Sequence, residues 1–431
     1  MRIRLRLPAI DGPLALAALG LVVIGLLFVY SATSVPGLHQ GLWAKQLAWA
    51  VVAVGAAALV AAIDYRVYDS LAIPLYGISL LLLVLVLFAG TSALGARRWL
   101  EIGPIRFQPS ELAKIATVLL LARLFDNPKI HLHRFEGWFP AALVALAPCA
   151  LVLKEPDLGT SLSFPAILIV MLYWGGMPLR QLALGLTPVF NVVLYLATGT
   201  LWWFVGLFAL LLAIPQPRSW DRRELRLHAS GRFSRLLGAL GPRLPALVVL
   251  VLVNGAVAFA TPHLWNHLHD YQKRRIETFL NPENDKLGAG YQIIQSRIAI
   301  GSGGIAGKGF LKGTQKALSF LPMRHTDFIF AVVGEEKGLL GTLTVVILYA
   351  VLILRGLRLG LVCRSTFASF MAIGIVTALF YHVMVNMLMA IGWAPVTGLP
   401  LPLLSYGGTA LIANGIEIGL LQNVALRRHE S

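Results

Sequence analysis

Residues 263–336 read HLWNHLHDYQKRRIETFLNPENDKLGAGYQIIQSRIAIGSGGIAGKGFLKGTQKALSFLPMRHTDFIFAVVGEE, and this segment decides how the chain is organised. It is the longest stretch that is not plainly membrane-apolar, and apolar runs lie on both sides of it. Nine of its residues are lysine or arginine. A polar connection this long between membrane helices is more often functional than a simple tether. We therefore interpret the rest of the chain as a scaffold that holds this segment at one face of a membrane.

The composition of the chain is typical of a protein that crosses a membrane many times. Hydrophobic residues make up 57% of it and charged residues 13%, and many windows exceed the roughly 18 apolar residues of a membrane helix. The net charge of +16 suits basic cytoplasmic loops against anionic lipid, so we expect no nucleic-acid partner. Cys149 and Cys363 lie in or beside apolar runs, which predicts neither a disulfide nor a metal–thiolate site.

The apolar runs predict one all-α polytopic membrane domain over residues 1–431. About twelve membrane helices are expected, at about 13–31, 42–63, 71–90, 110–125, 138–153, 161–174, 182–196, 201–214, 245–261, 339–354, 367–391 and 410–425. An even number places both termini on one side, and the arginine-rich segment 215–244 marks that side as cytoplasmic. The large loop, 262–338, is then extracytoplasmic.

Two of the predicted outer segments break the positive-inside rule. The segment 91–109 carries Arg97, Arg98 and Arg106, and the loop 262–338 carries ten lysine and arginine residues. Basic residues kept on the outer face need another reason, and an anionic ligand presented there supplies one.

Glu111 and Lys114 form a second candidate site, near the outer end of the fourth predicted helix. Their spacing of three residues places both side chains on one helix face. Ionisable residues inside a membrane helix are functional candidates by default, and a purely structural ion pair is the alternative. The nearby arginines of segment 91–109 favour a site that binds an anion.

The glycine-rich segment 301–309, GSGGIAGKG, is not a nucleotide-binding P-loop. In a P-loop four residues separate the first glycine from the Gly-Lys pair, and Ser or Thr follows it, whereas here Ser302 stands at the first glycine position and Gly309 follows Lys308. Two interpretations stay open. The glycines let backbone N–H groups approach a phosphate, or they form a cluster of flexible turns.

Other polar residues of the large loop differ in what they predict. His263, His267 and His269 lack acidic or cysteine partners at a convincing spacing, so we expect no metal site there. Asp285 lies in an irregular segment rich in Asn, Pro and Gly, beside basic residues, which suits a base that works next to a bound anion. Asp327 precedes an apolar run, and capping of a helix is its simplest interpretation.

Five motifs carry a resemblance to a known family. They read RRWLEIGPIRFQPSELAKIA, EPDLGTSL, HDYQKRRIETFLNPENDKLGAGYQIIQSRIAIGSGGIAGKGF, GTQKALSFLPMRHTDFIFAVVGEE and GLPLPLLSYGGTA. Together they resemble the SEDS family of peptidoglycan glycosyltransferases, which includes RodA, FtsW and SpoVE. HDYQ, GTQ and RHTDFIF point to the RodA-like elongation type rather than to the division type.

The resemblance implies an inverting glycosyltransferase that polymerises lipid II, an undecaprenyl-diphosphate-linked disaccharide peptide, during cell elongation and rod-shape maintenance. Asp285 matches the essential carboxylate of the family and would act as general base. The residues expected to bind the substrate are Arg97, Arg98, Trp99, Arg106, Glu111, Lys114, Asp157, Gln292, Gln295, Lys308 and His325. No cofactor is certain, and a divalent cation, Mg²⁺ or Mn²⁺, stays an open alternative.

The chain departs from the family pattern in three places. Lys286 stands where proline usually follows the essential Asp, and Glu155 stands where glutamine usually precedes Pro-Asp-Leu-Gly. The family has a core of ten helices, so about two extra ones are expected around 182–244. A lipid II flippase is the alternative function, but we find no convincing internal repeat.

The resemblance also implies partners and a location. It implies a class B penicillin-binding transpeptidase and other membrane proteins of the elongation complex as partners. We expect a multi-pass protein of the bacterial cytoplasmic membrane with its active site on the extracytoplasmic side.

Overall fold

The computed structural model describes residues 10–34, 41–93, 96–103, 105–130, 132, 135–198, 252, 254–257, 259–262, 273, 278, 289–314 and 323–429. The chain divides into two compact units. One consists of Met1–Gly176 with Arg275–Ser431, and the other is Met177–Arg274.

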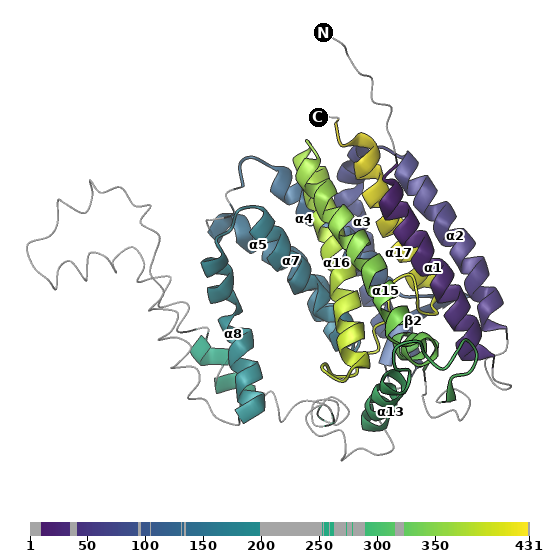
Figure 1. The fold of residues 1–431 in the computed structure, drawn as a ribbon. Coiled ribbons are helices and arrows are strands. Elements are labelled where there is room, and N and C mark those ends of the chain that lie inside the picture. Colours follow the sequence, from purple (N-terminus) through teal and green to yellow (C-terminus); the bar gives the residue numbers. More distant parts are fainter. Residues whose placement is uncertain are drawn as a thin grey trace, which may run out of the picture. The chain divides into compact units, whose positions relative to one another are not determined.

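The larger unit is a helical bundle with one small sheet (Figure 1). Its helices are α1 (Gly12–Thr33), α2 (Leu42–Ala62), α3 (Tyr65–Ala89), α4 (Pro109–Asp126), α5 (Phe135–Lys154), α6 (Leu158–Ser161), α7 (Ser163–Trp174), α13 (Ala289–Ser302), α15 (Ile329–Val362), α16 (Thr366–Ala390) and α17 (Gly408–Arg427). Its strands are β1 (Thr91–Ala93), β2 (Ala96–Ile102) and β3 (Ile105–Phe107). The smaller unit contains α8 (Leu179–Thr198), where Asn191 donates a hydrogen bond to Asn254 at 2.6 Å.

Seven of the described helices are long and apolar enough to cross a membrane, namely α1, α2, α3, α5 from Gly137, α15, α16 and α17. The helix α4 is not among them because Glu111, Lys114, Arg123 and Asp126 all lie within it. The predicted polytopic, mainly helical architecture is confirmed. The number of twelve helices stays a prediction, since 201–214 lies outside the described residues.

The centre of the bundle is formed by α4, α16 and α17. Within the most apolar window, 72% of α16 and 83% of α17 is buried, against 17% of α2 and 22% of α3. The helices α2 and α3 therefore lie at the outside of the bundle and expose apolar side chains there. Gly415 and Gly419 form a GxxxG pair on α17, and a Cβ at either would lie within 2.6 Å of a carbonyl oxygen of α2. This close backbone contact is the packing mode of small residues in membrane helices.

The bundle has two distinct ends (Figure 1). The start of α1 and the end of α17 lie together at one end, where the Asp11 backbone N–H donates to Gln422 Oε1 at 2.9 Å and Arg355 pairs with the Asp11 carboxylate. We call this the termini end. The sheet, α13 and the loop 391–407 lie at the other end, which we call the sheet end.

Three local predictions need correction. The segment 91–107 was expected to be a loop, so the all-α prediction is wrong there: it forms an antiparallel sheet in the order β1-β2-β3, with Thr91 opposite Trp99 and Leu100 opposite Phe107. The helix α4 begins at Pro109 with Gln108 as its N-cap, not at Ser110. The helix α15 begins at Ile329 rather than 339, and it is interrupted at Gly338.

Candidate functional site at the sheet end

Helix α16 carries a row of polar side chains that holds several loops of the sheet end. The Tyr381 hydroxyl donates to the carbonyl of Gly159 at 2.9 Å. The Asn386 amide donates to the carbonyls of Asp327 at 2.9 Å and Leu399 at 2.7 Å. One helix therefore fixes the relative positions of three segments that lie far apart in the sequence.

A buried ionisable cluster lies one residue from this row. Lys114 Nζ is 3.1 Å from Glu111 Oε1 and 2.9 Å from Nε2 of His382 on α16. Glu417 of α17 interacts electrostatically with both Lys114 and Glu111. All four residues are at most 5% exposed. Such a cluster is costly to bury inside a membrane bundle, which marks it as a functional candidate.

The geometry of the cluster sets the roles of its members. An ammonium group has no lone pair, so Lys114 donates to His382 Nε2, and the proton of the neutral imidazole lies on Nδ1. Glu111, in the first turn of α4, balances the ammonium charge and lies at the positive end of the helix dipole. Glu111 and Lys114 share one face of α4, as predicted, and they form the ion pair that was the alternative to an anion site, with both residues buried.

Arg98 is bound within the chain rather than presented to a ligand. Its guanidinium donates to the carbonyls of Glu155 and Pro156 and lies 3.6 Å from Asp157 Oδ2. Asp157 is the N-cap of α6, where it accepts hydrogen bonds from the N–H and the hydroxyl of Thr160. Arg98 therefore fixes the turn between α5 and α6.

Glu155 lies in this turn, just beyond the end of α5, and it is 1% exposed. Its Oε1 atom has no hydrogen-bond partner in the structure. Burial, together with the charge of Asp157, raises the pKa of Glu155 to about 8, and Arg98 opposes this rise. A neutral carboxyl group therefore takes the place of the glutamine that is usual in the family.

Arg106 is the exposed arginine of the sheet. Its side chain on β3 is 71% exposed and pairs at 3.0 Å with Glu101, which is itself 41% exposed. An exposed ion pair of this kind contributes about 0–1 kcal/mol, so Arg106 can exchange Glu101 for a stronger anion. Trp99 lies half-buried on β2, and Arg97 pairs with Ser92 in the β1–β2 register.

The glycine-rich segment docks by its backbone on the first turns of α15. The N–H groups of Lys308 and Gly309 each donate at 3.0 Å to the carbonyls of Glu335 and Glu336, and the N–H of Leu339 donates to the carbonyl of Gly304 at 2.9 Å. Neither of the two interpretations left open, a phosphate-binding backbone or a cluster of flexible turns, describes this segment. Its N–H groups are already bound to carbonyls within the chain.

Close approach explains the glycines in this contact. A Cβ at position 303 would lie 1.9 Å from the carbonyl oxygen of Gly334, and one at position 307 would lie 2.2 Å from that of Glu336. Gly307 also adopts φ +78°, a backbone region that side chains disfavour. Sequence reasoning recognised the glycines but not the partner backbone that requires them.

Two buried carboxylates complete the contact. Glu335 Oε1 accepts hydrogen bonds from Lys308 Nζ at 2.8 Å and from the Thr314 N–H at 2.7 Å. Glu336 accepts from the Ser31 hydroxyl of α1 at 2.6 Å and from the Leu311 N–H at 3.1 Å. Lys308, predicted to bind substrate, therefore serves this ion pair.

The remaining predicted site residues are not brought into one cluster. Gln292 and Gln295 lie half-buried on α13. His325 is 7% exposed, and its ring centroid lies 5.8 Å from that of Tyr406. Asp285, the predicted general base, lies outside the described residues. Within the described ranges, no group of three or more His, Cys, Asp or Glu side chains is arranged to hold a metal ion.

Sequence reasoning missed His382, Glu417, Glu335 and Glu336. The rule that selected Glu111 and Lys114 also selects His382 and Glu417, since both are ionisable residues inside apolar runs. Glu335 and Glu336 gave no comparable signal, because a Gly-Glu-Glu-Lys sequence is equally typical of an exposed loop.

The fold and this site define a polytopic membrane protein with a buried ionisable cluster near one end of its bundle. The family model described as a cell cycle protein, for FtsW, RodA and SpoVE, matches residues 13–215 and 233–430. The chain belongs to the FtsW/RodA/SpoVE family. The predicted SEDS resemblance is thereby confirmed.

Two relatives named as peptidoglycan glycosyltransferases are similar to the chain over nearly its whole length. The chain is 38% identical over 420 residues to the peptidoglycan glycosyltransferase MrdB of Escherichia coli K12, covering 97% of this chain and 94% of that one. It is 34% identical over 433 residues to the peptidoglycan glycosyltransferase RodA of Treponema pallidum, covering 97% and 98%.

Two solved structures also superpose on nearly the whole chain. One, described as showing the structural coordination of polymerization and crosslinking by a peptidoglycan synthase complex, superposes with a TM-score of 0.69 at 32% identity, over 98% of this chain and 99% of that one. The crystal structure of RodA from Thermus thermophilus gives a TM-score of 0.61 at 27% identity, over the same shares.

Proposed function

We propose that this chain is an inverting peptidoglycan glycosyltransferase that polymerises lipid II during cell elongation. The observation that carries the proposal is family membership over nearly the whole chain, with relatives named as peptidoglycan glycosyltransferases. The acceptor sugar hydroxyl attacks the anomeric carbon, the bond to the diphosphate breaks on the opposite side, and the configuration inverts. Asp285 takes the proton of the attacking hydroxyl.

The contacts within the chain divide the predicted substrate residues into two groups. Arg106 is exposed and only weakly paired, so we assign it to the diphosphate leaving group, where a cation stabilises the developing charge. Arg98, Lys114 and Lys308 are bound to carboxylates or carbonyls of the chain itself. Their role is to hold the walls of the site and to shape its field.

The orientation and the partner follow from the same proposal. The sheet end faces the extracytoplasmic side, where the lipid II headgroup is presented, and both termini are cytoplasmic. A class B penicillin-binding transpeptidase is the proposed partner, supported by the similarity to a synthase complex that coordinates polymerization with crosslinking. A divalent cation, Mg²⁺ or Mn²⁺, stays an open part of the proposal, and among the described residues no group of three or more His, Cys, Asp or Glu side chains is arranged to hold one.

Polymerisation of lipid II by the detergent-purified chain, with its transpeptidase partner added, tests the proposal. Asp285→Asn keeps the size of the side chain and removes its basicity, so the rate should fall by ~10²–10⁴-fold. Asp126→Asn, an exposed change at the termini end, is the matched control and should polymerise normally.

Two results would count against the proposal. A folded Asp285→Asn protein that polymerises at the normal rate removes Asp285 from the mechanism and shifts attention to Glu111 or Asp157. A purified wild-type chain that moves lipid II across vesicles without polymerising it favours the flippase.

A further inference from the structure

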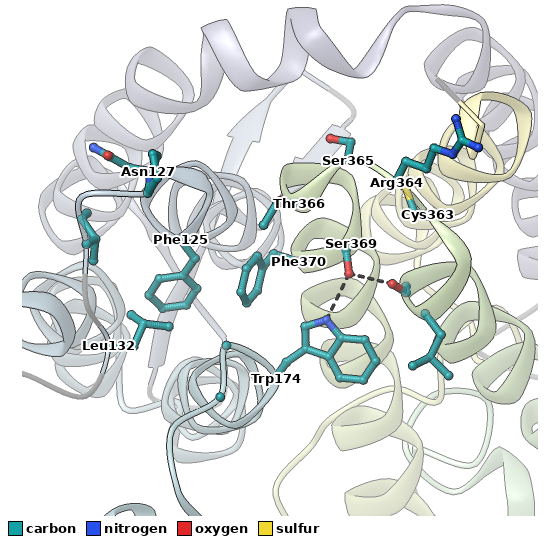
Figure 2. A pocket seen from close by; sticks show the side chains of 16 residues that line it. Phe125, Asn127, Leu132, Trp174, Cys363, Arg364, Ser365, Thr366, Ser369 and Phe370 are labelled. Carbon is teal, nitrogen blue, oxygen red and sulfur yellow. Dashed lines mark hydrogen bonds between the residues drawn. The ribbon is translucent and has the colours of Figure 1, made fainter. Parts of the chain in front are cut away.

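A cavity of about 710 Å³, whose lining side chains are drawn in Figure 2, opens at the termini end of the bundle, at the opposite end from the proposed site. It lies where α4 and α7 end and where the chain passes from α15 into α16. The proposed glycosyl transfer uses none of its lining residues. The cavity is therefore a separate feature that needs its own explanation.

One part of the cavity wall consists of aromatic rings whose polar neighbours are hydrogen-bonded, and Asn127, Ser365 and Thr366 add polar surface beside it. Phe125 and Phe370 contact each other with ring centroids 5.2 Å apart. The Trp174 indole N–H donates to the Ser369 hydroxyl at 3.0 Å, and that hydroxyl donates to the Gly360 carbonyl at 2.6 Å (Figure 2). These side chains offer an incoming molecule their apolar surfaces rather than free hydrogen-bonding groups.

The rim of the cavity is cationic. Arg364 is exposed at the rim, and its backbone N–H is fixed by the carbonyl of Arg428. No aspartate or glutamate lines the cavity, and no carboxylate pairs with Arg364 among the residues that the structure describes. Ser365 caps α16 through the Ala368 N–H, so the positive end of this helix dipole also points at the rim.

We propose that this cavity binds one anionic phospholipid of the leaflet at the termini end. The phosphate lies against Arg364 and the first turn of α16, and an acyl chain lies along Phe125, Phe370 and Trp174. The place of the cavity favours a lipid over a soluble anion, because it lies where two helices able to cross a membrane, α15 and α16, are joined at one end of the bundle, and because aromatic rings of its wall lie beside a cationic rim. This inference does not depend on the proposed catalytic function.

The chain supplies its own reporter for a test. Cys363 lines the cavity and is half-buried, whereas Cys149, the only other cysteine, is buried in the bundle. The full chain is placed in nanodiscs of phosphatidylcholine, or of phosphatidylcholine with phosphatidylglycerol, and the rate at which N-ethylmaleimide alkylates Cys363 is measured. A bound lipid should cover the thiol.

Phosphatidylglycerol should slow alkylation of the wild-type protein by roughly 5- to 10-fold, the ratio expected for about 1 kcal/mol from one arginine near the membrane surface. In Arg364→Ala this slowing should be lost. Arg358→Ala removes an exposed charge from the same end of α15 but outside the cavity, and it should behave as wild type. Native mass spectrometry should find phosphatidylglycerol retained by wild type and Arg358→Ala, and lost from Arg364→Ala.

Several outcomes would overturn the proposal. Equal slowing in all three proteins would assign the effect to the membrane surface potential, which lowers thiolate reactivity everywhere. Absence of slowing in wild type would exclude an anionic lipid at this position. Protection of Cys363 by a soluble acidic peptide in phosphatidylcholine alone would assign the cavity to a protein segment instead.

Discussion

Replacement of Glu155 by glutamine should make the protein more stable at alkaline pH. Glu155 is almost fully buried, one of its oxygens has no partner, and its pKa is raised to about 8. Below about pH 4.5 the carboxyl is neutral in the folded and the unfolded chain, so it adds no pH dependence. Between that pH and about 8 the unfolded chain releases its proton while the folded chain keeps it, so stability falls as pH rises.

The size of the effect follows from the pKa. A difference of one pKa unit between the folded and the unfolded chain corresponds to about 1.4 kcal/mol of stability. With a carboxyl pKa of about 8 in the folded chain and 4.5 in the unfolded chain, ionisation of Glu155 can lower the free energy of unfolding by roughly 4–5 kcal/mol at most. Relaxation around the charge and attraction by Arg98 make the actual loss smaller than this limit. We expect Glu155→Gln to raise the free energy of unfolding by about 1–3 kcal/mol above pH 8. Glutamine keeps the shape and cannot ionise.

The assay is thermal unfolding in one detergent at a fixed scan rate, measured from pH 5 to 9. The Tm of the wild-type protein should fall relative to that of Glu155→Gln as pH rises. For a long chain 1 kcal/mol corresponds to roughly 1–2 °C in Tm, so the two Tm values should differ by several degrees at pH 9. Glu101→Gln, at an exposed carboxylate of the same end, should leave the wild-type slope unchanged. Parallel Tm–pH curves for wild type and Glu155→Gln would show that Glu155 ionises normally and refute the reasoning.

Three further outcomes are expected. His382→Leu removes the acceptor of the Lys114 ammonium, so the rate of lipid II polymerisation should fall by roughly 10-fold or more. His382→Gln keeps an acceptor and should retain most of the activity. Equal loss in both variants would mean that the imidazole ring itself is needed. Gly307→Ala should lower the free energy of unfolding by about 2–3 kcal/mol because of its positive φ and the facing carbonyl. Gly301→Ala, with open space around it, is the matched control in the same thermal assay, and an equal Tm for the two would contradict the docking argument. Arg98→Ala should lower the free energy of unfolding by about 1–3 kcal/mol, because the contacts to residues 155–157 are lost. An unchanged Tm together with weaker substrate use would show instead that Arg98 binds the substrate.

Seven of the predicted membrane helices match long apolar helices of the structure, because long apolar runs are local and unambiguous. It placed Glu111 and Lys114 on one face of α4, and the structure pairs them. It did not predict the sheet over 91–107, because three short strands are stabilised by pairing with one another rather than by their own composition.

The start of α15 was missed for a similar reason. Glu335 and Glu336 are charged, so their segment was assigned to the polar loop, yet both are buried with partners from the glycine-rich segment and from α1. Those partners lie about 20 to 300 residues away, and single-sequence patterns do not carry that information. The same limit applies to Lys308 and Arg98, whose charge is visible in the sequence but whose partners are not.

The contact between residues 303–307 and 334–338 restricts how this region can vary. A side chain at position 303 meets the backbone of Gly334, and a side chain at position 338 meets the backbone of Gly307. A substitution on one side is usually rescued by a smaller residue opposite, but here both sides are already glycine. Double substitutions at these positions should therefore offer no route back to function, and a saturation library should leave Gly303, Gly307 and Gly338 without a tolerated pair.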